Sequence, residues 1–146
     1  MKFSAARETV LKPLQTVVGV VERRQTMPIL SNVLLSTQGT KLSITATDLE
    51  VEMVAEAEVK TDGAGEITVP GRKLHDIFRA LPEGTAVDVS LSGERLTIKG
   101  GRSRFTLSTL RATDFPTIDE IGAKQTLRVN RADLRRLVEK THFSMA

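Results

Sequence analysis

Three carboxylates stand two residues apart in the segment TDLEVEM, where Asp48, Glu50 and Glu52 could act as general acids or bases. Residues two apart on a strand share one face, so this spacing is typical of an exposed strand face. The two histidines, His75 and His142, are isolated on polar helix faces, which is typical of surface histidines. Motifs for a phosphate-binding loop, a nucleophile elbow, a zinc protease or a calcium loop are missing. We therefore expect no enzyme activity, no cofactor and no metal site.

Lysine and arginine are the remaining groups with an evident chemistry, since they bind phosphate. Residues 1–101 hold 12 Lys and Arg against 13 Asp and Glu, whereas residues 102–146 hold 9 against 5. A local basic excess indicates either a phosphate-binding surface or an ordinary solvated face. Because the chain has five Phe and no Tyr or Trp, the aromatic platforms that stack single-stranded bases are scarce.

The composition is that of a globular chain. Its 146 residues suit one domain with one core, and hydrophobic and charged residues make up 40% and 27%. The absence of cysteine excludes a disulfide scaffold and fits a reducing compartment. No apolar run approaches a membrane span and the start lacks an apolar signal region. These features favour a cytoplasmic protein without a membrane partner.

Two amphipathic helices are expected within the first 81 residues. In residues 6–21 an apolar face formed by valines and Leu14 recurs at spacings of three and four. Pro13 lies inside this helix, where it removes a hydrogen bond, and we expect a kink there. In residues 72–81 Leu74 and Phe78 belong to the buried stripe, and Arg72 and Arg79 lie on the opposite face.

Strands account for most of the remaining residues. Residues 51–59 alternate between apolar and acidic side chains, which is the period of a strand with one solvated face. Turn residues separate the other strand candidates, which are 33–37, 41–47, 66–69, 87–91, 95–99 and 102–110. We write the order as β-α-β-β-β-α-β-β-β and expect an α+β fold with two helices packed on antiparallel sheet.

The end of the sequence repeats its beginning. A shift of 124 residues places Phe3 on Leu127, and Arg7 on Arg131, so that a short strand again runs into a helix with the same face pattern. Asn130 stands at the capping position of this last helix. We therefore expect a first domain over residues 1–124, followed at 125–146 by the opening strand and helix of a truncated second domain.

Several blocks of the sequence resemble one known family along the whole chain and in the same order. They are MKF, LKPLQ, MPILSN, TDLEVEM, TVPGRKLHDIFRALPEG, GRSRFTLSTL, DFP and FSMA. The family is the β subunit of bacterial DNA polymerase III, the β sliding clamp. The resemblance covers the first of that family's three domains and the entry to the second.

The resemblance implies a DNA clamp domain and a role in replication. In the family, two three-domain subunits join head to tail into a homodimeric ring, with helices lining the hole through which duplex DNA passes. The ring tethers the replicative polymerase and is opened by a clamp loader. It is a processivity factor without catalytic residues of its own. The family's peptide-binding pocket lies between the second and third domains, so we expect it to be absent from this chain.

The resemblance also implies two sets of site residues. Contacts with duplex DNA, independent of sequence, are expected from six basic residues: Arg24, Arg72, Arg79, Arg23, Lys12 and Arg7. The strand RSRFTL is expected to form the dimer interface with an acidic partner, through Lys73, Arg102, Arg104, Phe105 and Leu107. Two such basic edges repel each other, so self-association of the chain is expected to be weak. The alternative function is a stand-alone β-rich interaction module with no role in nucleic-acid binding.

Overall fold

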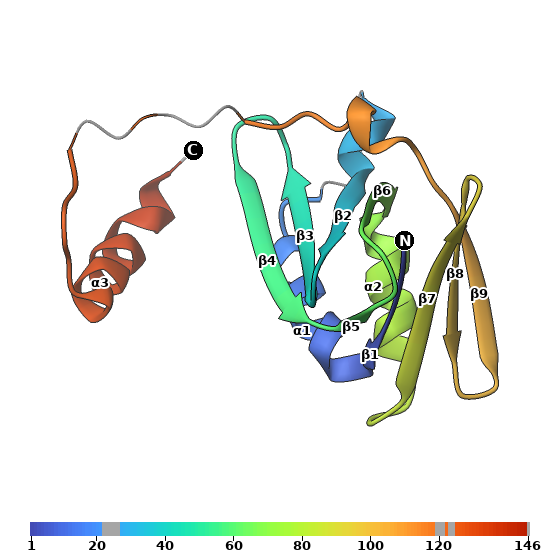
Figure 1. The fold of residues 1–146 in the computed structure, drawn as a ribbon. Coiled ribbons are helices and arrows are strands. Elements are labelled where there is room, and N and C mark those ends of the chain that lie inside the picture. The colour runs from blue at the N-terminus through green and yellow to red at the C-terminus, as the bar shows by residue number, and fades with distance from the viewer. Residues whose placement is uncertain (22–26, 119–121, 123–124, 146) are drawn as a thin grey trace.

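The computed structural model describes residues 1–21, 27–118, 122 and 125–145. Two antiparallel sheets form the body of the molecule (Figure 1). The first has the order β5-β1-β7-β8-β9 and contains β1 (Lys2–Ala6), β5 (Lys60–Thr61), β7 (Ala86–Ser92), β8 (Arg95–Gly100) and β9 (Ser103–Ser108). The second has the order β4-β3-β2-β6 and contains β2 (Asn32–Gln38), β3 (Lys41–Thr47), β4 (Glu52–Glu58) and β6 (Gly65–Pro70).

Two helices cover the inner faces of these sheets. The first, α1 (Arg7–Val17), packs on β4, β3 and β1, and the second, α2 (Gly71–Ala80), packs on β2, β6 and α1. Short 3₁₀ turns, η1 (Pro28–Ser31) and η2 (Ala112–Asp114), precede β2 and follow β9. Apolar residues of both sheets and both helices join in one core cluster, in which Leu14 and Val17 have no exposed surface.

The expected α+β class with antiparallel sheet is confirmed, but the strand count is not. Four strands of six or seven residues, and the two-residue β5, lie between the helices, where the predicted order counts three strands. The strands also divide into two sheets. Local periodicity identifies a strand but carries no information on which sheet it joins, because pairing is decided by distant residues.

The first helix is shorter than its apolar pattern predicts. Helical structure ends at Val17, and residues 18–20 form a turn that includes Gly19, which disfavours helix. Val21 is buried although it lies outside the helix, so its place in the apolar pattern indicates burial and not helical structure. The helix runs without a break through Pro13, whose ring is buried. The second helix spans Gly71–Ala80 rather than residues 72–81.

A buried polar chain joins the two sheets. The Asn32 side-chain amide donates to the Thr68 hydroxyl at 2.9 Å, and that hydroxyl donates to the Leu110 carbonyl at 3.0 Å. The backbones of Thr68 and Leu110 also form an isolated bridge between β6 and the segment after β9. Because each of these buried polar groups has a partner, they fix the sheets relative to each other without an unsatisfied donor.

The last helix, α3 (Arg131–Thr141), contributes nothing to this core. Its N-cap is Asn130, as expected, with the side chain accepting from the Ala132 amide at 2.8 Å. None of its residues is buried, and Leu134, Leu137 and Val138 are about half exposed. A 3₁₀ turn, η3 (His142–Ser144), follows it. Within the described part of the chain, no helix has the length and apolar character needed to cross a membrane.

The start of α2 gives a test of the packing. A Cβ atom on Gly71 would lie 2.8 Å from Val33 Cγ1 and 3.2 Å from Val21 Cγ2. We predict that Gly71→Ala lowers the free energy of unfolding by about 1–3 kcal/mol, because the added methyl overpacks the core. Gly19→Ala is the matched control, since nothing lies within 4 Å of its added methyl. Urea denaturation measures both variants, and equal midpoints would contradict the prediction.

Candidate nucleic-acid interface

Helix α2 presents its basic residues away from the core. Leu74 and Phe78 are buried, and Arg72, Lys73 and Arg79 are exposed. The Arg72 guanidinium donates to the carbonyl of Val21. This bond ties the guanidinium to the segment that follows α1, while Arg72 as a whole remains exposed.

Besides Arg72 and Lys73, the exposed lysines and arginines of α1 and α2 are Lys12 and Arg79. Arg79 lies 3.4 Å from Asp76, and its side chain is 68% exposed, so this ion pair is weak. Lys12 is exposed on α1, which packs directly against α2. The structure therefore brings Arg72, Arg79 and Lys12 onto one helical layer. Arg23 and Arg24 lie outside the described residues.

Arg7 has an internal role that the sequence did not reveal. Its guanidinium donates to the carbonyls of Phe78 and Arg79 at 2.8 and 3.1 Å, and its side chain is only 12% exposed. These carbonyls end α2 and have no partner within the helix, so Arg7 acts as a C-terminal cap of α2. The nucleic-acid contact expected of Arg7 competes with this role, because the donors already have partners inside the protein.

Glu8 extends the same connection between α1 and the segment after α2. Its carboxylate accepts from the Gly84 amide and from Arg7, both at 3.1 Å. The Gly84 hydrogen bond is the main reason that the pKa of Glu8 is lowered, and Arg7 adds to the effect. The Arg7 amide donates to the Thr85 carbonyl at 2.9 Å. The start of α1 is therefore fixed to the end of α2 through charged groups at the surface.

Two of the three carboxylates of TDLEVEM, Asp48 and Glu52, have structural partners. Asp48 accepts from the amides of Glu50 and Val51 at 3.0 and 2.7 Å, which closes the turn between β3 and β4. The Val51 hydrogen bond is the larger cause of the lowered pKa of Asp48. Glu52 accepts from the Ile118 amide at 3.2 Å. Asp48 therefore stabilises the turn between β3 and β4, and Glu52 attaches the chain that follows η2 to β4.

The histidines occupy different surroundings. His142 is exposed, with its Nδ1 3.0 Å from the Glu139 carbonyl. The side chain of His75 is only 16% exposed, with Nδ1 3.7 Å from Asp76 Oδ1. His75 is thus more buried than a polar-face position predicts. Across the described residues, no group of three or more His, Asp or Glu is arranged to hold a metal ion.

The predicted interface strand, β9, lies at the edge of its sheet. It pairs with β8, and the side chains alternate as expected, with Arg102 and Arg104 exposed. Phe105 is half-buried against the core. Leu107 is 8% exposed and belongs to the core itself, so its side chain has little surface left for a partner. Lys73 is exposed on α2 rather than on this strand.

One hollow lies away from these basic residues. It has a volume of about 550 Å³ and opens between β1, the start of α1 and the end of β4. Its ionisable residues are Glu58 and Lys60, and small side chains such as Ala5 and Ala86 form much of the remainder.

Comparison with known proteins gives consistent matches. Residues 1–119 match the family model of the DNA polymerase III beta subunit, N-terminal domain. Beta sliding clamps of Pseudomonas putida and Escherichia coli are 54% and 50% identical over the whole chain. The chain spans 40% of the length of each of these relatives.

Solved structures agree with the sequence matches. A sliding clamp from Pseudomonas aeruginosa, described as bound to griselimycin, superposes with a TM-score of 0.94 at 52% identity, covering 100% of this chain and 40% of that one. A sliding clamp from Caulobacter crescentus gives a TM-score of 0.94 at 46% identity, covering 98% of this chain and 39% of that one.

The hydrogen bonds that the Glu8 carboxylate accepts from Gly84 and Arg7 predict a pH dependence of stability. A lowered pKa in the folded state means that the charged carboxylate stabilises the fold above its ordinary value of 4.5. This contribution is lost as the pH falls through the lower, folded-state pKa. We predict that Glu8→Gln is less stable than the unchanged chain at neutral pH, and that the difference disappears in acid. Urea denaturation at several pH values measures it, and a constant difference would contradict the assignment.

Proposed function

The chain belongs to the family of the bacterial DNA polymerase III beta subunit, and from that premise we propose that it is the N-terminal part of a replicative sliding clamp. The complete ring encircles duplex DNA and tethers the replicative polymerase for processive synthesis in the cytoplasm. It is a processivity factor without catalytic residues of its own. A clamp loader opens the ring, and the second subunit joins head to tail.

The basic helical layer is the observation that supports this function. Arg72, Arg79 and Lys12 are exposed on α1 and α2, on the side of the domain away from the outer faces of the sheets. We propose that these side chains face DNA, together with Arg23 and Arg24. Arg7 serves mainly to hold α1 to α2, and its contribution to DNA binding is indirect.

Sliding limits how strongly such residues can bind. Long basic side chains that contact phosphates carry no sequence information, so they allow movement along any duplex. Tight or base-specific contacts would hold the protein at one site. A ring therefore depends on closure for its grip and needs only a weak positive field inside.

The β9 edge is our proposed contact with the partner subunit. Its outer face carries Arg102 and Arg104, and Lys73 is a further exposed cation. We propose that acidic residues of the partner pair with these three. Phe105 would be covered when the partner strand joins, whereas Leu107 stabilises the domain from within.

We also propose that residues 1–124 form the first clamp domain and that residues 125–146 open the second. The resemblance of α3 to α1 supports this division. The apolar stripe of α1 is buried against β4 and β3, whereas the stripe of α3 is exposed. A second sheet, supplied by a following domain, would cover it.

Duplex binding by the chain tests the DNA proposal. An open domain has no topological hold, so we predict a dissociation constant no better than about 10⁻⁴–10⁻⁶ M at physiological salt, without sequence preference. Arg72→Ala and Arg24→Ala should each reduce the slope of log K against log salt by about 0.9, the contribution of one phosphate contact. Fluorescence anisotropy on two unrelated duplexes at several salt concentrations measures both quantities.

Arg95→Ala is the matched control, since it removes one positive charge from β8 rather than from the helical layer. Nanomolar affinity for one duplex alone would indicate a sequence-specific protein and contradict the clamp. Equal salt slopes for Arg72→Ala, Arg24→Ala and the unchanged chain would remove these arginines from the interface.

Hydrogen exchange tests the proposed domain division. None of the α3 residues is buried, so the helix has no tertiary support. An isolated helix of this length is only marginally stable in water. We predict that α3 amides exchange far faster than those of β2 and β3 in a dilute solution of this chain. Equal protection in α3 and the central strands would show that α3 docks on the first domain.

A further inference from the structure

Helices α1 and α2 are joined at both ends by arginines. Arg7, the first residue of α1, donates to two carbonyls in the last turn of α2. Arg72, in the first turn of α2, donates to the Val21 carbonyl in the segment that follows α1. The packed helices therefore run in opposite directions, and each begins beside the end of the other. Each helix thus carries, near its first residue, a donor that holds the other helix.

The two arginines differ in what remains for a ligand. Arg72 makes one such bond and is exposed, so it can also reach a phosphate. Arg7 donates through Nε to the Phe78 carbonyl and through Nη2 to the Arg79 carbonyl. Its Nη1 donates to Glu8, and its side chain is only 12% exposed. Because all three nitrogens of the Arg7 guanidinium are engaged within the protein, Arg7 is placed to hold the helices and not to bind a phosphate.

Glu8 connects this guanidinium to the segment that follows α2. One oxygen of its carboxylate, Oε1, accepts from Arg7 Nη1 and from the Gly84 amide, each at 3.1 Å. The Arg7 amide donates to the Thr85 carbonyl at 2.9 Å, so the backbone of Arg7 is fixed as well. We call these hydrogen bonds of Arg7 and Glu8 with residues 78–85 the α2 tether. A guanidinium fork that binds two successive carbonyls fixes the direction as well as the distance of its partner.

The α2 tether acts on the backbone that carries two exposed cations. The carbonyl held by Arg7 Nη2 belongs to Arg79 itself, and Lys12 lies about one and a half turns from Arg7 on α1. The Arg79 side chain makes an exposed and therefore weak ion pair with Asp76, so its position depends mainly on its backbone. The spacing between Arg79 and Lys12 is thus set by the position of α2 on α1.

We propose that Arg7 and Glu8 are positioning residues for duplex DNA: the α2 tether holds Arg79 and Lys12 at a fixed spacing, and neither Arg7 nor Glu8 contacts a phosphate. This proposal rests on the DNA-binding function proposed above and adds the residues that arrange the basic layer. Without the tether, the long cationic side chains still reach the phosphates, but binding then has to order the helices. Affinity therefore falls by the same factor at every salt concentration.

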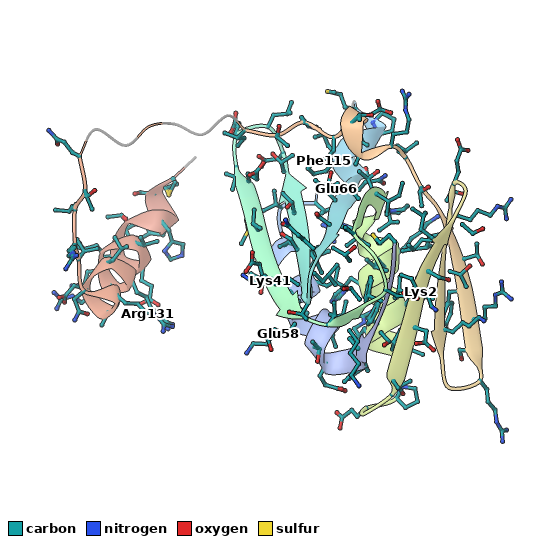
Figure 2. The ribbon with its side chains drawn as sticks, viewed as in Figure 1. Lys2, Lys41, Glu58, Glu66, Phe115 and Arg131 are labelled. Carbon is teal, nitrogen blue, oxygen red and sulfur yellow. The ribbon has the colours of Figure 1, made fainter. Side chains whose placement is uncertain are left out.

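The charge of Glu8 makes the proposal testable by the sign of an effect. A carboxylate near a phosphate-binding surface repels phosphate, so its removal strengthens binding if its charge alone matters. A role in the α2 tether predicts the opposite, because the same carboxylate holds Arg7 and Gly84. Glu58 provides the comparison, since it is exposed beside the start of α1, and Figure 2 shows it pointing away from the body of the domain.

Duplex binding by variants of Arg7 is the first test. Arg7→Lys keeps the positive charge but replaces the planar fork by a single ammonium group. We predict that its affinity for duplex DNA is about three- to tenfold lower at every salt concentration, with an unchanged slope of log K against log salt. Arg7→Gln should behave in the same way although it loses the charge. Fluorescence anisotropy measures the affinities, circular dichroism verifies that each variant is folded, and Arg95→Lys on β8 is the matched control.

The same titration with Glu8→Ala gives the test by sign. We predict weaker binding to duplex DNA in spite of the lost negative charge. Glu58→Ala, the matched control, removes the same charge and should bind at least as tightly as the unchanged chain. Tighter binding by Glu8→Ala would show that its charge, and not the α2 tether, acts on DNA. Glu8→Gln, which also removes the charge, replaces Glu8→Ala if that variant does not fold.

Spin labels measure the arrangement of the helices without DNA. Because the chain has no cysteine, Gln15→Cys on α1 and Ala80→Cys on α2, both at exposed positions, carry the two labels. The distribution of distances between the labels, measured by double electron–electron resonance, should be narrow in the otherwise unchanged chain and broader when Arg7→Lys is added. Equal widths in the two folded proteins would show that the tether does not hold α2 in place and would overturn the proposal.

The outcomes separate this proposal from the function on which it rests. Normal affinity in Arg7→Lys would leave Arg7 a structural residue only. Normal affinity in Arg7→Lys together with a slope reduced by about 0.9 in Arg7→Gln would make Arg7 a direct phosphate contact. Either result overturns the positioning role and leaves the DNA-binding surface as proposed. An unchanged slope in Arg72→Ala would instead remove α2 from DNA binding and overturn both.

Discussion

The burial of one face of α1 is the contact on which the rest of the structure depends. Leu14 and Val17 have no exposed surface, and their helix touches strands of both sheets as well as α2. A second connection between the sheets is the polar chain through Asn32 and Thr68, which reaches the segment after β9 together with the Thr68–Leu110 bridge. Because this face is fully used for packing, the opposite face of the helix is necessarily polar. The basic layer and the core are thus two consequences of one amphipathic pattern.

Local patterns predicted the elements, whereas contacts between distant residues decided what the elements do. The alternation in β4 and the apolar stripe of α2 could be predicted because each depends on residues two to four positions apart. The cap that Arg7 provides joins residues 71 and 72 positions apart, and nothing in the neighbourhood of Arg7 distinguishes it from a solvated arginine. The same holds for the half-buried His75. The sequence indicates this cap only weakly, through a basic residue at the start of one helix that is followed by a second helix of similar length.

The edges of the sheets show the same division. The alternation of side chains in the sequence predicted which residues of β9 face outward, and the resemblance to sliding clamps predicted an interface there. The acidic face of β4 looked like an ordinary solvated surface, since three glutamates on a strand need no partner. Only the topology shows that this face belongs to a terminal strand at the far side of the domain from β9. Charge pattern and strand order are both needed before the two edges can be compared.

The proposed contact at the β9 edge is directional, because its exposed cations favour an acidic partner over a second β9 edge. A contact between two different surfaces repeats from one unit to the next, and the rotation between units decides whether the assembly closes into a ring or continues as a filament. In a closed ring every edge is covered, which removes the aggregation hazard of free strands. Each junction can then be modest, because a unit leaves only when two junctions open together. Such a ring needs little affinity for what it surrounds, and this agrees with a helical layer that offers a few exposed cations and no aromatic platform for bases.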